Sequence, residues 1–205
     1  GNPVRKDMVD IVDKRIDAAT FFGLDSAKKT IVVVGGSQGA RSINRAVKSG
    51  LNQLRDSGIQ LVWQCGVPFL DEAKQAIDEC GMKNVRVFDF ISRMDYAYAI
   101  SDLIISRAGA STVSELCVVG KPAILIPLPT AAEDHQTYNC KSLVEKGAAI
   151  LVKDELASTS LVNEAIRLIN NPSELSSLSN NISKLSVTNA AERIADEILT
   201  LINIK

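Results

Sequence analysis

The sequence predicts an α/β fold built on a doubly wound parallel sheet of about six strands. Six short β-rich runs alternate with longer helical stretches, which is typical of consecutive βαβ units wound right-handed. The first run, Ile31–Val34, is continuously apolar, as expected for a strand buried on both faces. Glycines and prolines end most of the runs and separate them from the helices.

The strands are expected at residues 31–34, 59–63, 85–88, 103–105, 123–126 and 149–152. Helices are expected at about 40–54, 68–80, 96–100, 111–119, 134–146, 161–169, 173–185 and 190–202. Residues 1–28 contain no strand, but Ile11, Val12 and Ile16 follow a helical spacing. This lead-in either packs on the sheet or connects to something upstream.

Composition excludes several classes of protein. The chain has 205 residues, a net charge of −1 and 46% hydrophobic residues, which fits one large domain or two small ones. The near-neutral charge predicts no nucleic-acid partner and no polybasic membrane anchor. The longest apolar runs, Ile31–Val34 and Ala123–Ile126, are too short to span a bilayer. The start shows neither a signal peptide nor an initiator Met, so we expect a piece of a longer protein.

Neither a metal nor a cofactor is predicted. Cys65, Cys80, Cys117 and Cys140 form no CxxC pair, and reduced thiols are expected instead of a zinc cluster or redox motif. No Asp-x-Asp motif occurs, and the adjacent carboxylates of Glu133 and Asp134 are more typical of a helix cap than of a metal pair.

A doubly wound sheet binds ligands at the carboxyl ends of its strands. The first strand is followed by the glycine-rich turn Gly35–Arg41, which is neither a P-loop nor GxGxxG. Glycines allow close backbone approach, and the next helix start attracts an anion, to which Ser37 adds a hydroxyl. The alternative is a tight turn without a ligand.

The segment after the fourth strand, Ser106–Glu115, is rich in small residues before a helix. Thr112 and Glu115 have the spacing of a capping box, in which Glu115 would satisfy a backbone N–H. Glu115 would equally suit a ribose diol, as acidic residues do in nucleotide sites. Spacing alone leaves both interpretations open.

Two further strand ends carry polar or aromatic candidates. After the fifth strand, two prolines indicate a rigid loop, Asp134 is a plausible N-cap, and Gln136 offers an amide. His135 is the only histidine, and a lone histidine is usually a surface or packing residue. After the third strand, Phe90 and Ile91 form either the wall of a base pocket or part of the core, and the core is favoured. Together these ends suit a nucleotide diphosphate that carries a sugar.

Four motifs in this order make the chain recognisable: Gly35–Ala40, Arg107–Glu115, Gly120–Ala123 and Asp134–Asn139. They resemble the C-terminal half of the MurG family, whose members transfer N-acetylglucosamine from UDP-N-acetylglucosamine to undecaprenyl-pyrophosphoryl-N-acetylmuramoyl-pentapeptide. The opening Gly1–Arg5 resembles the interdomain segment of this family. The resemblance covers essentially the whole chain.

The resemblance implies one half of a GT-B glycosyltransferase, in which two Rossmann-like domains face each other across a cleft. Residues 1–28 would be an interdomain lead-in and first helix, and residues 29–205 the domain that binds the UDP-sugar donor. The acceptor-binding N-terminal domain would be absent, so this chain alone is expected to be inactive. The full-length enzyme would be cytoplasmic and peripheral on the inner face of the cell membrane.

The resemblance also assigns roles to residues of this sequence. No certain catalytic residue lies in this domain, and the reaction, which inverts the anomeric centre, needs no metal. Arg5 and Ser37, with Gly36 in the turn, would contact the donor diphosphate. The Ile91 backbone would read the uracil, and Glu115 would hold the ribose hydroxyls. The helix start that presents N–H groups to the phosphates comprises Ala110, Ser111, Thr112, Val113 and Ser114. Gln136 would bond the sugar hydroxyls, with His135 beside it.

Other functions compete with this interpretation. The chain could be a UDP-sugar-binding subunit or domain of a related GT-B transferase or epimerase that needs a partner for catalysis. A dinucleotide-dependent oxidoreductase is a weaker alternative, because GxGxxG is missing. The last predicted helix has an apolar face with Ile194, Ile198 and Leu201, which either packs on this sheet or crosses to another domain and is partly exposed here.

Overall fold

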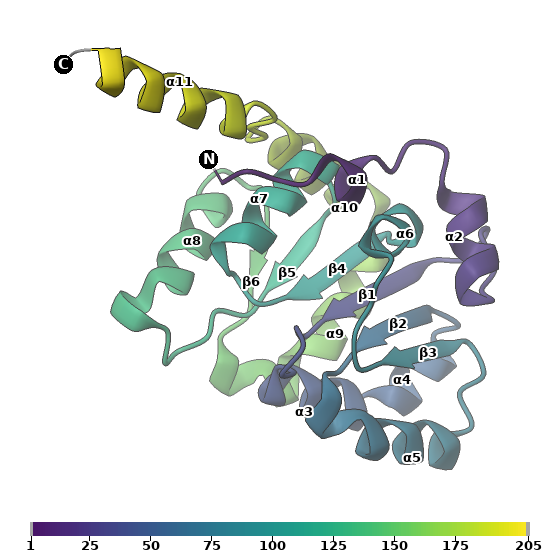
Figure 1. The fold of residues 1–205 in the computed structure, drawn as a ribbon. Helices are drawn as coiled ribbons and strands as arrows, with labels where there is room; N and C mark the ends of the chain where they lie inside the picture. The colour runs from purple at the N-terminus through teal and green to yellow at the C-terminus, as the bar shows by residue number, and fades with distance from the viewer. Residues whose placement is uncertain (1, 204–205) are drawn as a thin grey trace.

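Six parallel strands form one sheet in the order β3-β2-β1-β4-β5-β6, as the computed structural model shows (Figure 1). It describes residues 2–203, without the side chains of 7, 8 and 203. The strands are β1 (Thr30–Val34), β2 (Gln60–Gln64), β3 (Val85–Phe88), β4 (Leu103–Ser106), β5 (Ala123–Leu125) and β6 (Ile150–Leu151). This is the strand order of a doubly wound, Rossmann-like sheet, so the predicted fold class and all six predicted strands are confirmed.

Alternation along the central strands separates two hydrophobic cores, one on each face of the sheet. In register, Val32 of β1 lies between Val62 of β2 and Ile104 of β4, and all three belong to one core. Their neighbours Val33 and Trp63 belong to the other core. Both faces are apolar because both are covered by helices, which explains the continuous apolar run in β1.

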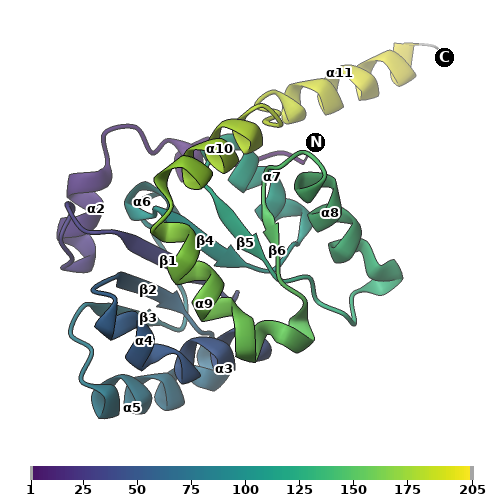
Figure 2. The same ribbon diagram turned by 180° about the vertical axis from the view of Figure 1, so that it is seen from behind.

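The helices divide between these two faces. The first face is covered by α3 (Arg41–Ser49), α4 (Leu51–Asp56), α5 (Leu70–Cys80) and α9 (Ala157–Ile169) (Figure 2). The second face is covered by α2 (Arg15–Phe22), α6 (Met94–Ile100), α7 (Ala110–Val119) and α8 (His135–Val144) (Figure 1). The helix α10 (Pro172–Ser183) reaches both cores, with Leu178 in the first and Ile182 in the second. Short 3₁₀ turns lie at Val67–Phe69, Ala132–Asp134 and Asp154–Leu156.

The prediction of one continuous helix at 40–54 is wrong, because the helix is broken at Gly50 between α3 and α4. The break has a packing cause in α9. A Cβ atom on Gly50 would lie 2.5 Å from Cγ2 of Val162, well inside van der Waals contact. Only glycine lets the α3–α4 junction approach α9 this closely.

The lead-in packs on the sheet, but only one of the apolar positions that the helical spacing suggested, Ile11, packs against the second core. Val12 and Ile16 are 75% and 70% exposed, and the chain turns at Asp13, whose φ is +58°. Between the short α1 (Lys6–Val9) and α2 the chain is not helical. The second core instead receives Ala18, Ala19 and Phe22 from α2.

The last helix, α11 (Ala190–Asn203), extends away from the sheet and its covering helices (Figures 1 and 2). Ile194, Ile198 and Leu201 are 45%, 51% and 68% exposed. The alternative in which this helix packs on the sheet is therefore wrong. None of the helices in residues 2–203 is both long enough and apolar enough to span a bilayer.

Candidate functional site

The strand order reverses direction between β1 and β4, which are hydrogen-bonded neighbours. The chain leaves β1 toward α3 on one face and leaves β4 toward α7 on the other face. The two connections therefore diverge at the carboxyl ends of these strands, and the region between them corresponds to the crevice of a topological switch point. In open α/β sheets this is the position where ligands bind.

The glycine-rich turn after β1 is held against the end of β2. Gly39 has φ +74°, and a Cβ atom on it would lie 2.2 Å from the carbonyl oxygen of Cys65, far inside van der Waals contact. Gly66, with φ +80°, would likewise place a Cβ atom 2.3 Å from the backbone N of Gly39. Gly36 differs, since its φ is +75° but no heavy atom lies within 4 Å of its Cβ position. Two glycines therefore serve packing, whereas Gly36 and the exposed Ser37 border open space.

The helix after β4 begins earlier than predicted. Gly109 is the N-cap, and the first intrahelical bond runs from the N–H of Val113 to the carbonyl of Gly109 (2.9 Å). The N–H groups of Ala110, Ser111 and Thr112 precede that bond and point out of the helix end. Because Thr112 lies inside α7, the capping-box interpretation of Glu115 is wrong.

Glu115 lies in the second turn of α7, with a half-buried side chain. Its Oε2 accepts a hydrogen bond of 2.5 Å from the hydroxyl of Tyr98, which is buried on α6. Burial and the nearby Glu115 carboxylate raise the pKa of Tyr98 well above its usual value, so the hydroxyl stays protonated and donates. Tyr98 was not among the predicted site residues.

The other predicted residues of α7 have separate environments. Val113 packs against the second core. Ser114 accepts a bond of 3.4 Å from the side-chain amide of Asn2. This contact places the start of the chain on α7, and α1 packs against α6 and α7 as well (Figure 1). Arg5 is the exposed N-cap residue of α1 in this segment.

Ile91 and Phe90 have different positions after β3. Ile91 is buried, and its N–H donates to Oε1 of Gln64 (3.1 Å) at the end of β2. Phe90 is 60% exposed, so its prediction as a core residue is wrong, and that of Ile91 is confirmed. Phe90 lies in the loop after β3, where no hydrophobic periodicity predicts whether a side chain is buried or exposed.

The loop after β5 is fixed by the helix that follows it. Oε1 of Gln136 accepts the N–H of Leu128 (3.0 Å), whereas the amide nitrogen of this side chain makes no hydrogen bond within residues 2–203. The exposed His135 contacts the carbonyl of Ala132 through Nδ1 (2.8 Å). Asp134 is the N-cap of α8 as predicted, but its carboxylate accepts from the hydroxyl of Thr137 (2.6 Å) instead of a backbone N–H.

The side chain of Arg107 bonds to the segments that follow β1, β5 and β6. The sequence did not indicate this role. Nη1 donates to the carbonyl of Ile126 (3.1 Å) and to the carboxylate of Asp154 (2.5 Å), and Nη2 donates to the hydroxyl of Ser42 (3.0 Å). Ser42 is also bonded to Asp154. From α8, Asn139 donates to the carbonyl of Ala108 (3.0 Å). These bonds join α3, α7 and α8 into one frame at the carboxyl edge.

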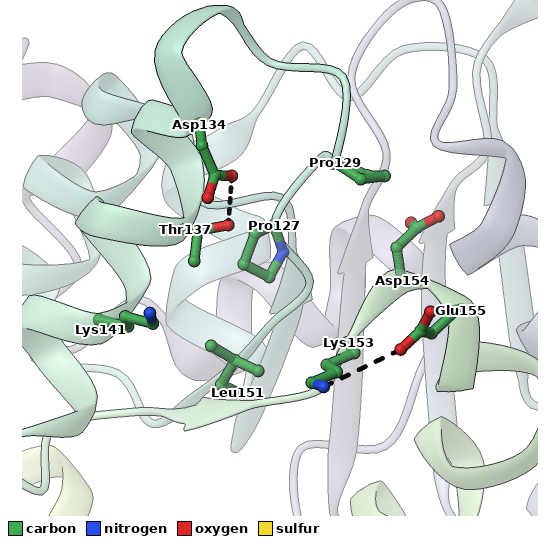
Figure 3. Close-up of a pocket in the computed structure, with 9 residues that line it drawn as sticks. All are labelled: Pro127, Pro129, Asp134, Thr137, Lys141, Leu151, Lys153, Asp154 and Glu155. Carbon is green, nitrogen blue, oxygen red and sulfur yellow. Dashed lines mark hydrogen bonds and ion pairs between the residues drawn. The ribbon is translucent and has the colours of Figure 1, made fainter.

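A cavity of about 530 Å³ lies beside this frame, between α8 and the segment that follows β6 (Figure 3). One wall carries the bonded pair Asp134 and Thr137, and another carries Lys153 paired with Glu155 at 4.0 Å. The cavity contains none of the predicted site residues. Its lining comprises Pro127, Pro129, Asp134, Thr137, Lys141, Leu151, Lys153, Asp154 and Glu155.

The titratable sulfur groups lie in the core instead of the crevice. Burial raises the pKa of Cys65 to about 11 and that of Cys140 to about 12, so both remain thiols at neutral pH. All four cysteines are unpaired. Within residues 2–203, no group of three or more His, Cys, Asp or Glu side chains is arranged to hold a metal.

Comparison with known proteins agrees with this geometry. The family model of the glycosyltransferase family 28 C-terminal domain matches residues 30–197. Two curated relatives carry the name UDP-N-acetylglucosamine--N-acetylmuramyl-(pentapeptide) pyrophosphoryl-undecaprenol N-acetylglucosamine transferase. The one from Parabacteroides distasonis is 46% identical over 100% of this chain and 56% of its own length. The one from Phocaeicola vulgatus is 47% identical over 98% of this chain and 54% of its own length.

A solved structure of MurG from Acinetobacter baumannii superposes with a TM-score of 0.78 at 28% identity, over 97% of this chain and 57% of that chain. The chain thus spans about half the length of the relatives that it matches. The resemblance to the MurG family, which the four motifs indicated, is confirmed. The chain belongs to the family of glycosyltransferase family 28 C-terminal domains.

Proposed function

We propose that this chain binds the UDP-N-acetylglucosamine donor of an inverting hexosyltransferase. The full-length protein would transfer N-acetylglucosamine to the lipid-linked muramoyl-pentapeptide precursor of peptidoglycan. Residues 29–205 would form the donor domain and residues 1–28 the lead-in from the acceptor domain. The enzyme would act as a cytoplasmic protein, peripheral on the inner face of the membrane. The names of the relatives support the reaction, and the crevice supports the donor.

One observation carries the proposal: an open helix start and a half-buried carboxylate lie on the same helix at the switch point. The N–H groups of Ala110, Ser111 and Thr112, with the helix dipole, would bind the diphosphate. Glu115, on the next turn, would accept from the ribose hydroxyls. The glycine turn brings Ser37 to the same crevice, where its hydroxyl would donate to a phosphate oxygen.

The remaining contacts follow from the groups that the fold leaves available. The carbonyl of Ile91 would accept from the uracil, because its N–H is engaged by Gln64. The amide nitrogen of Gln136 would donate to sugar hydroxyls, because its oxygen is engaged by Leu128. His135 would lie beside the sugar.

The chemistry needs stabilisation of the leaving group. When an acceptor hydroxyl attacks the anomeric carbon, negative charge develops on the β-phosphate oxygen of the departing UDP. Donors aimed at this oxygen lower the barrier, which is the role we assign to the α7 helix start and to Arg5. The acceptor and its general base would be supplied by the part of the enzyme outside this chain.

The test is calorimetric titration of the chain with UDP-N-acetylglucosamine, UDP, dTDP and NAD. We expect binding of the two UDP ligands and about tenfold to hundredfold weaker UDP binding by Glu115→Ala, since the lost bonds involve a charged acceptor. Glu79→Ala is the matched control, because Glu79 is an exposed carboxylate on α5 whose one hydrogen bond in the described part of the chain comes from Gln75. A preference for NAD, or equal UDP affinity of Glu115→Ala and the parent chain, would reject the proposal.

A further inference from the structure

Tyr98 is a buried residue whose polar end reaches the candidate site. Its ring belongs to the second core and is 2% exposed. A phenylalanine would fill the same volume without any polar group to satisfy. The hydroxyl nevertheless has a partner, and that partner is the Oε2 atom of Glu115 on the neighbouring helix, at 2.5 Å.

The bond divides the two oxygens of the Glu115 carboxylate between two tasks. Oε2 receives the tyrosine hydroxyl, whereas Oε1 makes no hydrogen bond within residues 2–203. A glutamate side chain has three rotatable bonds, and a ligand that must freeze them pays for lost conformational entropy. A carboxylate fixed from behind avoids most of this loss.

We propose that Tyr98 is a positioning residue for ribose recognition: its hydroxyl holds Glu115 so that Oε1 faces the ribose diol of the donor. This inference rests on the proposed function, because it deepens the role given there to Glu115. Tyr98 itself would not touch the ligand, since it is 2% exposed and its ring lies in the second core.

The arrangement also accounts for selectivity between nucleotides. An ionised carboxylate only accepts hydrogen bonds, so its outward oxygen favours a sugar that offers hydroxyl donors. A nucleotide without ribose hydroxyls gains nothing from the fixed carboxylate. The contribution of Tyr98 to affinity should therefore appear only with ligands that carry the diol.

The experiment compares UDP with 2′,3′-dideoxy-UDP as calorimetric ligands of the parent chain, Tyr98→Phe, Glu115→Gln and the double variant. We expect Tyr98→Phe to weaken UDP binding about tenfold, the range of one hydrogen bond to a charged group. Its affinity for dideoxy-UDP should match that of the parent. In the Glu115→Gln background, Tyr98→Phe should cause no further loss of UDP affinity.

Tyr96→Phe is the matched control, since Tyr96 lies on the same helix and its ring instead packs under the guanidinium of Arg93 (3.5 Å to the ring centroid). This variant should leave both affinities unchanged. The affinity for dideoxy-UDP reports whether each variant keeps a folded crevice, and thermal unfolding checks the same point independently.

The possible failures can be told apart. If the parent chain does not bind UDP, or Glu115→Gln binds UDP as the parent does, the proposed function fails and this inference fails with it. If Glu115→Gln weakens UDP binding but Tyr98→Phe does not, only the positioning role is rejected. Equal losses for UDP and dideoxy-UDP in Tyr98→Phe would reduce Tyr98 to a packing residue and also overturn the inference.

Discussion

The two edges of the sheet use similar polar residues in different ways. At the amino edge, Arg15 of α2 bonds both oxygens of Asp102 (3.1 and 3.0 Å) and the carbonyl of Ile100 (2.9 Å). Lys121 donates to the carbonyl of Ser101 (2.8 Å). Both cations donate to oxygen atoms of the protein itself, and these bonds tie together the segments at the amino edge.

At the carboxyl edge a similar network is accompanied by side chains that have an unused hydrogen-bonding atom. Arg107 is held by Asp154 and Ser42 and closes the frame, as Arg15 does at the amino edge. Around it, however, Glu115 and Gln136 each use one polar atom for the protein. The other atom of each makes no hydrogen bond within residues 2–203, and under the proposed function the donor would use it. The carboxyl edge thus combines a closed frame with side chains that use only part of their hydrogen-bonding capacity.

The largest effect is expected from breaking the frame at Arg107. Arg107→Ala should lower the free energy of unfolding by about 3–5 kcal/mol, because it removes one partner of a mostly buried ion pair. Urea denaturation of parent and variant measures this. Arg167→Ala is the control, since Arg167 is likewise an ion-paired arginine, but its partners Glu164 and Glu174 bind it at the surface. It should cost about 1 kcal/mol or less. Equal losses of unfolding free energy in the two variants would show that Arg107 does not stabilise the carboxyl edge more than a surface ion pair does.

A second large effect is expected on catalysis, at a cation of the lead-in. In the full-length protein, Arg5→Ala should raise the transition-state free energy by about 2–4 kcal/mol, as removal of one oxyanion donor does. The readout is kcat/KM for donor turnover. Lys6→Ala removes an equal charge from the next residue, which is also exposed. Near-parental kcat/KM in Arg5→Ala would remove Arg5 from the site.

The buried Lys121 at the amino edge should make the stability of the protein depend on pH. Burial is the main cause that lowers the pKa of Lys121 to about 8, from 10.5 in an unfolded chain. Between these values the unfolded state binds more protons, so the contribution of Lys121 to stability rises with pH. Below pH 8 the folded protein carries the full cost of a buried charge.

Lys121→Met isolates this contribution. The variant should gain most relative to the parent below pH 8, and the difference in unfolding free energy should shrink by about 2–3 kcal/mol as the pH approaches 10.5. Urea denaturation at several pH values between 7 and 10.5 measures the difference. A difference that stays constant with pH would show that Lys121 titrates as an ordinary surface lysine.

The sequence was sufficient for the sheet and for the positions of its loops. Continuous apolar runs identify strands buried on both faces, and glycine and proline identify where each ends. The motifs then led to the family and to Glu115. Sequence spacing misled where packing decided the outcome. Gly50 breaks a helix because α9 lies against it, and Thr112 lies inside α7 because Gly109 starts the helix.

Residues that act across elements gave no sequence signal. Tyr98 and Glu115 are 17 positions apart, and Arg107 and Asp154 are 47 apart. No local period connects such pairs, because the fold alone brings them together. A tyrosine hydroxyl needs a partner once it is buried, but the sequence alone does not show that Tyr98, rather than the nearby Tyr96, is the buried one.

The smallest predicted effect separates the two edges most directly, through two glycines with the same left-handed backbone conformation. Gly36 in the carboxyl-edge turn has φ +75°, and Gly58 before β2 at the amino edge has φ +71°. No heavy atom lies within 4 Å of the Cβ position of either. Alanine at each should therefore cost a similar 1–2 kcal/mol, roughly the penalty of a left-handed conformation.

The two variants should differ only toward the ligand. Gly36→Ala places a methyl group in the open space beside Ser37 and should weaken UDP binding, whereas Gly58→Ala should bind UDP as the parent does. Thermal unfolding and calorimetric titration of both variants give the two readouts. If both variants bind UDP equally well, the glycine turn is a structural turn without a ligand, because its open side then faces solvent alone. A loss confined to Gly36→Ala would instead mean that this glycine is required by what binds at the edge, as Gly39 is required by what packs behind it.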